Sequence, residues 1–166
     1  MPFVQVRATP IASYAIQTFE TLGGLAATEV AYTASRIRLP ASLFSANARF
    51  TFTALLEVAT DPGGADTVDF RIRMGGGPIL AVQGPIDPAM GDTCVLQGDL
   101  RVNSAGTAYD VYSVAKATSN TFIPYTLLGQ AFAYAGVPQN LTVTEECTAT
   151  AGTFTLREFR CMVYSA

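Results

Sequence analysis

Apolar and polar residues alternate along much of the chain, and a period of two predicts β-strands. In residues 67–74 the apolar residues take every second position, namely Val68, Phe70, Ile72 and Met74. Because successive side chains of a strand point to opposite faces, this segment predicts a strand with one buried and one wet face. The glycines and the proline of residues 75–78 predict the turn that ends it.

The segment 48–59 shows the same alternation over a longer stretch. Its apolar phase consists of Phe50, Phe52, Ala54, Leu56 and Val58. Leu55 interrupts the polar phase, and we expect it to meet a neighbouring subunit. Residues 61–64 read Asp-Pro-Gly-Gly, which predicts a turn. The segments 48–59 and 67–74 are therefore expected to form an antiparallel pair joined by a loop of about seven residues.

A second hairpin is predicted from residues 94–103 and 107–115, with the turn at 104–106. The segment 107–115 is apolar on both faces, which is typical of a strand that touches both a core and a partner. The segment 153–164 changes phase, because Phe154 and Leu156 share one face while Phe159 and Cys161 share the other. A β-bulge near residues 157–158 would place both sets in the core. Residues 141–146 predict a companion strand.

Further strands are expected at residues 3–8, 36–39, 79–82 and 126–133, and no segment keeps a helical period. Many short strands without helices predict an all-β fold, a two-sheet antiparallel jelly-roll sandwich. We expect the sandwich to occupy residues 31–166. Residues 1–30 lack clean alternation and are interpreted either as an extended N-terminal arm or as the first strands.

The composition suggests contact with other protein subunits. Only 14% of residues are charged, against about 25% in typical soluble domains. This predicts surface buried against other subunits; the alternative is a plain, Thr-rich β-surface. The ten basic residues are scattered in a chain of net charge −3, so nucleic-acid binding is not expected. No apolar run is long enough for a membrane span, and no signal peptide is recognised, so synthesis in a cytoplasm is expected.

The residue types present give little support to an enzymatic function. The chain has no histidine, which removes the commonest general base and zinc ligand. The expectation is therefore a protein that is not an enzyme and uses no metal or cofactor. The three cysteines are Cys94, Cys147 and Cys161. We interpret them as reduced and partly buried; a bridge between Cys147 and Cys161, or one across a subunit contact, is the alternative.

Three groups of polar or aromatic residues have the chemistry of possible sites. Glu145 and Glu146 are adjacent, so on a strand they face opposite ways and cannot act as a pair. A calcium site would draw on Asp61, Asp66 and Asp69, but these lack EF-hand spacing and fit an ordinary turn. A sugar-binding platform would draw on aromatic residues of the second half, namely Phe122, Tyr125, Phe132 and Tyr134. Core and interface packing is the simpler interpretation of those four.

Four segments of the chain resemble one group of viral proteins. Residues 35–44, 69–76, 98–106 and 153–160 are similar, in order and spacing, to the strand-and-turn motifs of jelly-roll structural proteins of tailed bacteriophages. The resemblance covers residues 30–166. The chain lacks the tryptophan often found before the third motif, and residues 1–30 have no counterpart.

This resemblance implies a virion protein, most simply a homotrimer, that binds the major capsid protein or other virion proteins. Members of the group serve as head decoration (cement) proteins, head fibres or spikes, or tail-associated attachment proteins. The first expectation is thus a decoration or spike protein that stabilises a shell. The alternatives are a tail or fibre protein that binds a host-surface receptor or glycan, and a C1q- or TNF-like binding module.

Overall fold

A computed structural model describes residues 10–16, 19–23, 28–60, 67–75, 77–87, 89–118, 123–131, 136–148 and 152–164. These residues form twelve strands and one short 3-10 helix, η1, over Ala41–Leu43. The strands are β1 (Ala12–Ala15), β2 (Glu20–Gly23), β3 (Glu29–Ala31), β4 (Ile37–Leu39), β5 (Arg49–Thr60), β6 (Val68–Met74), β7 (Ile79–Ile86), β8 (Thr93–Val102), β9 (Ala108–Ala117), β10 (Ile123–Ala131), β11 (Gln139–Cys147) and β12 (Thr153–Tyr164). No helix in this described part is long and apolar enough to cross a membrane.

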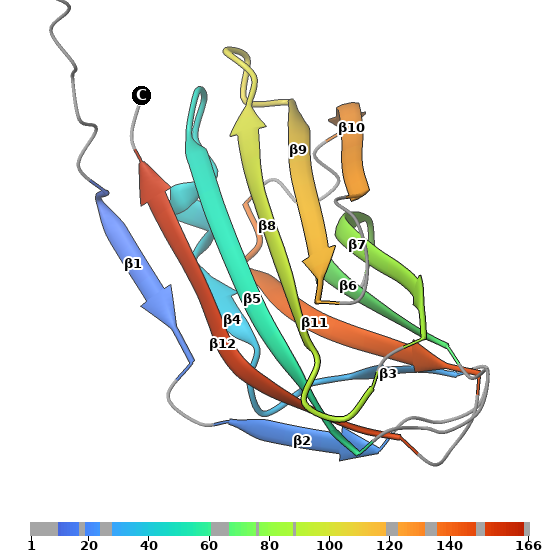
Figure 1. Cartoon of the computed structure of the whole chain (residues 1–166). Coiled ribbons are helices and arrows are strands. Elements are labelled where there is room, and N and C mark those ends of the chain that lie inside the picture. The colour runs from blue at the N-terminus through green and yellow to red at the C-terminus, as the bar shows by residue number, and fades with distance from the viewer. Residues whose placement is uncertain are drawn as a thin grey trace, which may run out of the picture.

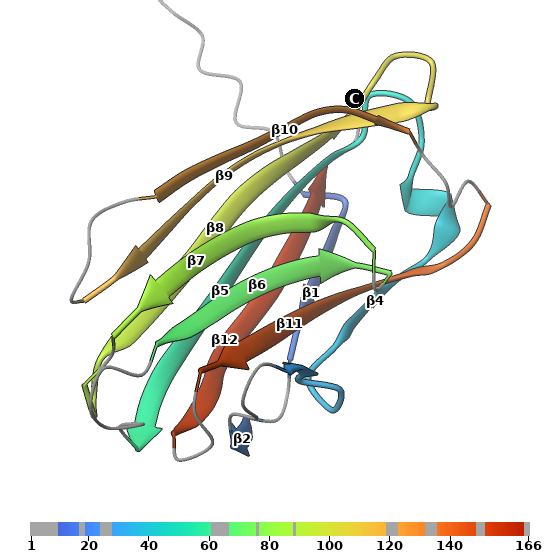
Figure 2. The ribbon, with the colours of Figure 1, turned by 90° about the vertical axis from the view of Figure 1, so that its right-hand side faces the viewer.

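The strands form two antiparallel sheets packed face to face (Figure 1). The large sheet has the order β1-β12-β5-β8-β9-β10, and β2 also pairs with β12. The small sheet has the order β3-β11-β6-β7, and β4 also pairs with β11. Figure 2 shows β6, β7 and β11 in front of β5, β8 and β12. The predicted all-β jelly-roll sandwich is confirmed.

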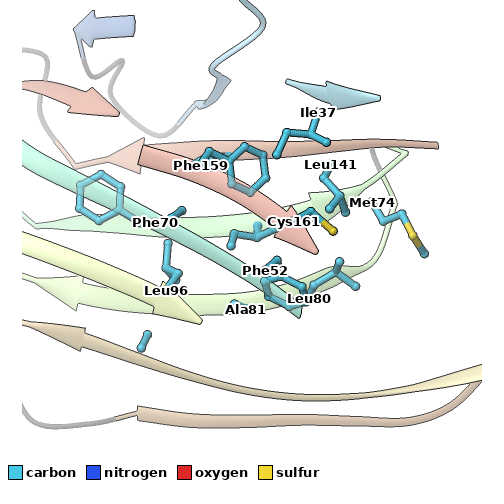
Figure 3. Close-up of a cluster of buried hydrophobic side chains, with 14 of the residues drawn as sticks. Ile37, Phe52, Phe70, Met74, Leu80, Ala81, Leu96, Leu141, Phe159 and Cys161 are labelled. Atoms are coloured by element: carbon cyan, nitrogen blue, oxygen red, sulfur yellow. The ribbon is translucent and has the colours of Figure 1, made fainter. Parts of the chain in front are cut away.

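Apolar side chains from the inner faces of both sheets fill the space between them (Figure 3). The largest fully buried ones are Tyr32, Phe50, Phe52, Phe70, Phe154, Phe159, Leu39, Leu56, Ile72, Met74, Leu80 and Leu96. The predicted phases of β5, β6, β8 and β9 are those observed. Phe70 on the small sheet meets Phe154 on the large sheet edge to face, with ring centroids 5.3 Å apart, a favoured aromatic geometry.

The predicted bulge in the last strand is confirmed. The pairing of β12 with β5 shifts register between Leu156 and Glu158. The residues on both sides of the shift, Phe154 and Leu156 before it and Phe159 and Cys161 after it, are all buried. The inserted residue, Arg157, is exposed. One extra residue therefore lets a strand with two apolar phases bury both.

The expected pairing of residues 48–59 with 67–74 is wrong. β5 lies in the large sheet between β12 and β8, whereas β6 lies in the small sheet between β11 and β7. The connection after β5 crosses from one sheet to the other, so it is not a hairpin loop. The alternation of apolar and polar residues could not tell whether β5 and β6 are neighbours in one sheet or lie in different sheets. The same side chains point into the core in both cases.

Other connections agree with the sequence analysis. β8 and β9 form the predicted hairpin, with Cys94 opposite Ala117 at one end and Val102 opposite Tyr109 at the other. β6 and β7 pair across the predicted glycine turn. The strands expected at 36–39, 79–82 and 126–133 correspond to β4, β7 and β10. The strand expected at residues 3–8 lies outside the described residues, as does much of the segment considered as an arm. Within that segment, β1 and β2 pair with β12, and β3 pairs with β11.

One outermost strand of each sheet, β10 in the large sheet and β7 in the small sheet, carries features that oppose further pairing. β10 contains Pro124, and its pairing with β9 shifts register between Leu127 and Gln130. Within that irregularity the Gly129 amide donates to Asp110 Oδ1 at 2.7 Å. β7 contains Pro85, and its pairing with β6 shifts register twice. Prolines and bulges leave an edge strand a poor template for another chain.

A buried polar cluster ties the chain between β3 and β4 to the core. The Tyr32 hydroxyl donates to Glu145 Oε2 and lies 3.3 Å from the Phe154 carbonyl oxygen. Both side chains are fully buried, and Glu145 Oε1 has no hydrogen-bond partner. Burial raises the pKa of Glu145 to about 7, although the Tyr32 hydrogen bond acts in the opposite direction. Burial and the nearby Glu145 carboxylate both raise the pKa of Tyr32.

The first prediction concerns Phe70. Replacing it with alanine should lower the free energy of unfolding by about 3–5 kcal/mol, because the change leaves a cavity against Phe154. Urea unfolding followed by circular dichroism measures this loss. Val82→Ala on β7, a half-buried outer-face position, is the control and should cost less. Near-equal losses would contradict the assigned inner face.

The second prediction concerns the pH dependence of stability. The folded pKa of Glu145, about 7, exceeds the ordinary value, so the folded state holds its proton more tightly than the unfolded state. The resulting stabilisation is fully present below about pH 4.5 and is lost as the pH rises through about 7. Between these limits wild type should lose about 3 kcal/mol relative to Glu145→Gln.

Chemical denaturation of both proteins across this pH range tests the prediction. The difference between their free energies of unfolding should grow with pH and then level off. Glu146→Gln is the matched control, because it removes a carboxylate from the outer face of the same strand. A difference between wild type and Glu145→Gln that does not change with pH would contradict the assignment.

Candidate interaction surface

The outer face of the large sheet presents three rows of side chains that run across its strands. Strand register places these residues opposite one another in turn. One row is Met162, Thr51, Asp99, Tyr112 and Thr126; the next is Arg160, Thr53, Gln97, Val114 and Pro124; the third is Glu158, Leu55, Val95 and Lys116. The apolar members gather over β8, β9 and β10.

A groove crosses the three strands β8, β9 and β10 at this place. Its larger part has a volume of about 450 Å³ and is lined by Gln97, Gly98, Asp99, Tyr112, Ser113, Val114, Pro124, Tyr125 and Thr126. A smaller part of about 190 Å³ is lined by Val95, Gln97, Val114, Ala115 and Lys116. The two parts share Gln97 and Val114, so they form one continuous depression, named here the outer groove.

Gly98 lies in the floor of the outer groove, and the position of its missing side chain faces the core. A Cβ atom at this position would lie 2.3 Å from Cζ of Phe52 and 2.9 Å from Cβ of Ser113. Such distances are far below van der Waals contact, so the phenyl ring of Phe52 occupies the space on the inner side. A core residue thus packs directly beneath the floor of the outer groove.

The outer groove has an apolar centre and a polar border. Val95 and Val114 are half-buried, and the side chain of Tyr112 is 49% exposed. Gln97, Asp99 and Lys116 stand around them. An apolar centre rich in aromatic area and surrounded by polar groups is the usual composition of a protein–protein contact.

Ion pairs join the carboxylate of Asp99, in the outer groove, to two arginines beside it. The Arg49 Nε donates to Asp99 Oδ2 at 2.5 Å, and the Arg101 Nε donates to Asp99 Oδ1 at 3.0 Å. The Arg49 guanidinium also lies 5.8 Å from the centroid of the Tyr164 ring. Exposed pairs of this kind contribute little to stability. The two guanidinium groups outnumber the one carboxylate, so this end of the outer face keeps a net positive charge.

Three side chains of the outer groove region were indicated by the sequence. Leu55 was the apolar residue on the polar face of β5, and it lies opposite Val95 at the border of the groove. Tyr112 and Val114 share one face of the strand predicted to be apolar on both faces, and the structure directs that face outward. The sequence did not indicate Gln97, Asp99 or Pro124, because their place beside Tyr112 depends on pairing between β8, β9 and β10.

The aromatic platform considered from the sequence is only partly described. Tyr125 points inward, because it pairs with Ser113 on the inner face of β9, and its carbonyl oxygen accepts from Ser113 Oγ at 3.4 Å. Phe122, Phe132 and Tyr134 lie outside the described residues. The exposed aromatic side chain at the outer groove is instead Tyr112.

The carboxylates weighed from the sequence lie apart. Glu145 is buried in the core, and Glu146 lies on the outer face of the small sheet, where it accepts from Arg71 at 2.6 Å. Asp69 is also paired with Arg71, and burial raises its pKa. Asp61 and Asp66 are outside the described residues. Among the residues that the structure describes, no cluster of three metal-binding side chains occurs.

All three cysteines are buried and unbridged. Burial raises the pKa of both Cys94 and Cys161 to about 12. A thiol that stays protonated is a poor nucleophile. Their environment is that of small apolar core residues.

Comparisons with known proteins bear on the fold. Neither protein-family models nor curated protein sequences match the chain. Among solved structures, the lectin UEA-II complexed with galactose is similar, with 11% identity, a TM-score of 0.52 and coverage of 95% of this chain and 100% of that chain. The lectin from Bauhinia forficata in complex with GalNAc has 6% identity, a TM-score of 0.50 and coverage of 93% and 98%.

A marine PL-14 alginate lyase from Aplysia kurodai is also similar, with 7% identity, a TM-score of 0.46 and coverage of 74% of this chain and 71% of that chain. At these identities the likeness to the two lectins concerns the fold alone. It agrees with a jelly-roll sandwich built from two antiparallel sheets.

Proposed function

We propose that this protein is a non-enzymatic structural subunit of a bacteriophage particle, a head decoration or spike protein that binds other protein subunits. The observation that carries the proposal is the outer groove, where Val95, Tyr112 and Val114 gather on an otherwise polar face with Leu55 at the border. Single exposed apolar residues are ordinary, but a contiguous group with a polar border is typical of a contact surface.

The resemblance to phage jelly-roll proteins supports the same proposal. Its four motifs fall on β4 and η1, on β6, on the end of β8 with the following turn, and on β12. These segments come from both sheets, so the resemblance concerns the sandwich as a whole. The particle would supply the protein partner that covers the outer groove, either another copy of this chain or the major capsid protein.

The edge strands of the sandwich favour a protein that binds its partners through a sheet face. Proline and register shifts protect the strands β7 and β10 from pairing with another chain, and the opposite edges consist of strands of only three or four residues. Association through a face is therefore favoured over association through an edge. Repeated use of one face around a symmetry axis gives a closed oligomer. Many copies bound at once add their contacts, which is how such a subunit would stabilise a shell.

The third prediction concerns the oligomeric state. The purified protein should be an oligomer, most simply a trimer, and Val114→Glu should shift it to monomers by placing a charge in the outer groove. Val82→Glu is the matched control, a half-buried valine on the outer face of the small sheet. Native mass spectrometry measures both masses, and circular dichroism confirms folding.

Two outcomes would contradict the proposal. One is a monomeric wild type together with absence of the chain from purified phage particles analysed by mass spectrometry. The other is equal loss of the oligomer in both valine variants, which would show that the outer groove is not the contact.

A second candidate function is binding of a host-surface glycan by a tail or fibre protein. Half of the Tyr112 side chain is exposed, and Gln97, Asp99 and Thr126 stand beside it in the outer groove. An aromatic ring stacks on the apolar face of a sugar, while amide, carboxylate and hydroxyl groups bond its hydroxyls.

The fourth prediction follows from this candidate. The purified protein should bind neutral oligosaccharides on a glycan array, and Tyr112→Ala should abolish the signal while the fold is retained. Tyr164→Ala, at the far end of the same face, is the control. An array without signal for wild type would remove this candidate and leave the subunit contact in place.

A further inference from the structure

A second depression lies on the outer face of the small sheet, where two short strands pair with the same neighbour. β3 pairs with β11 as far as Ala31 opposite Thr144, and β4 resumes the pairing at Ile37 opposite Leu141. The residues between them leave the sheet and open a groove of about 460 Å³. It is lined by Ala31, Thr33, Arg36, Gly75, Val137, Pro138, Gln139, Asn140 and Thr142 and is named here the split groove.

The split groove holds an arginine without a carboxylate partner. In the described part of the chain, the arginines in ion pairs are Arg49, Arg71, Arg73, Arg101, Arg157 and Arg160. Arg36 and Arg38 are the described arginines that form none. Both are exposed, and Arg36 lines the split groove. In a protein of net charge −3, one unpaired guanidinium group thus lies in the split groove and a second lies two residues further along the chain.

The backbone directs these two side chains to the same face. Burial alternates strictly from Ser35 to Leu39, with Arg36 and Arg38 at the exposed positions. Side chains two residues apart on a strand lie about 7 Å from each other on one face. Arg38 is opposite Asn140 in the β4–β11 ladder, and Asn140 lines the split groove. The two guanidinium groups can therefore act on one ligand.

The carboxylate of Glu29, near the split groove, already has hydrogen-bond partners. Glu29 on β3 accepts from Arg73 Nε at 2.5 Å and from Arg73 Nη2 at 2.7 Å, and it also accepts from the Thr144 hydroxyl. The hydrogen bonds from Arg73 hold the pKa of Glu29 below its ordinary value. Glu29 is thus fixed beside the split groove as a partner of Arg73.

We propose that the split groove binds carboxylate side chains of an acidic segment of a partner protein. The planar guanidinium of Arg36 matches a carboxylate in bidentate geometry. Asn140, Thr33 and Thr142 add hydrogen-bonding groups, while Val137, which is 55% exposed, and Pro138 supply an apolar wall for the rest of a peptide. This site lies on the sheet opposite the outer groove, so it is a second and separate contact.

The charged side chains on the outer face of the small sheet favour an acidic peptide over a nucleic acid as the ligand. A polynucleotide is held by many phosphate contacts along a basic stripe. The outer face of the small sheet instead carries Glu29, Asp69 and Glu146 together with Arg71 and Arg73. A polyanion crossing this face would meet those carboxylates, whereas a short acidic segment needs only the two unpaired arginines.

The fifth prediction tests the proposal with a hexaglutamate peptide as the probe. Titrated at low ionic strength into the isotope-labelled full chain, it should shift the backbone amide signals of Thr33, Gly75, Asn140 and Thr142. The dissociation constant should be on the order of 1 mM. Arg36→Gln should weaken binding about tenfold or more, because a charge-assisted pair is lost, and Arg38→Gln should weaken it less.

Arg160→Gln is the matched control, because it removes the same charge from an exposed arginine of the large sheet, 52% exposed in its side chain. It should leave the affinity within about twofold of wild type. Equal weakening by Arg160→Gln would overturn the proposal, and so would the absence of shifts at the split groove. Tighter binding of an oligothymidylate or of inorganic phosphate than of the peptide would assign the site to phosphate instead. None of these results depends on the mass of the oligomer. A failure of the acidic-peptide proposal can therefore be distinguished from a failure of the proposed function.

Discussion

Packing of apolar side chains between the two inner faces is the interaction on which the other features depend. Phe52, Phe70, Phe154 and Phe159 fill the space between the sheets, and no described disulfide or metal cluster assists them. This packing fixes which side chains of each strand point outward. Because Phe52 presses against Gly98, it also shapes the floor of the outer groove. The surface of this protein is thus partly set by its core.

Much of the fold could be predicted from the sequence, because alternation reports directly which face of a strand is buried. The bulge in β12 was predictable for the same reason, since Phe154 and Phe159 otherwise require opposite phases. Sheet membership was not predictable, as the wrong pairing of β5 with β6 shows. The inner face of a strand is a local property, whereas its neighbours are set by contacts between distant segments.

The two candidate surfaces also differ in how far the local sequence indicated them. Leu55 and the two apolar faces of β9 gave a local indication of the outer groove. The split groove gave none, because an arginine is recognised as unpaired only when the partners of the other arginines are known. Glu145 was predicted only in part. Its separation from Glu146 onto the opposite face was predicted, but its burial was not, and its partner Tyr32 comes from a distant segment.

The two outer faces of the sandwich differ in chemistry. The large sheet offers an apolar groove beside one aspartate that two arginines share, and the small sheet offers a network of ion pairs beside two unpaired arginines. Proline and register shifts occupy β7 and β10, one outermost strand of each sheet. A sandwich bounded in this way can be crowded to very high local concentration without templating cross-β growth at those edges, so its solubility there is protected by backbone geometry and not by charge.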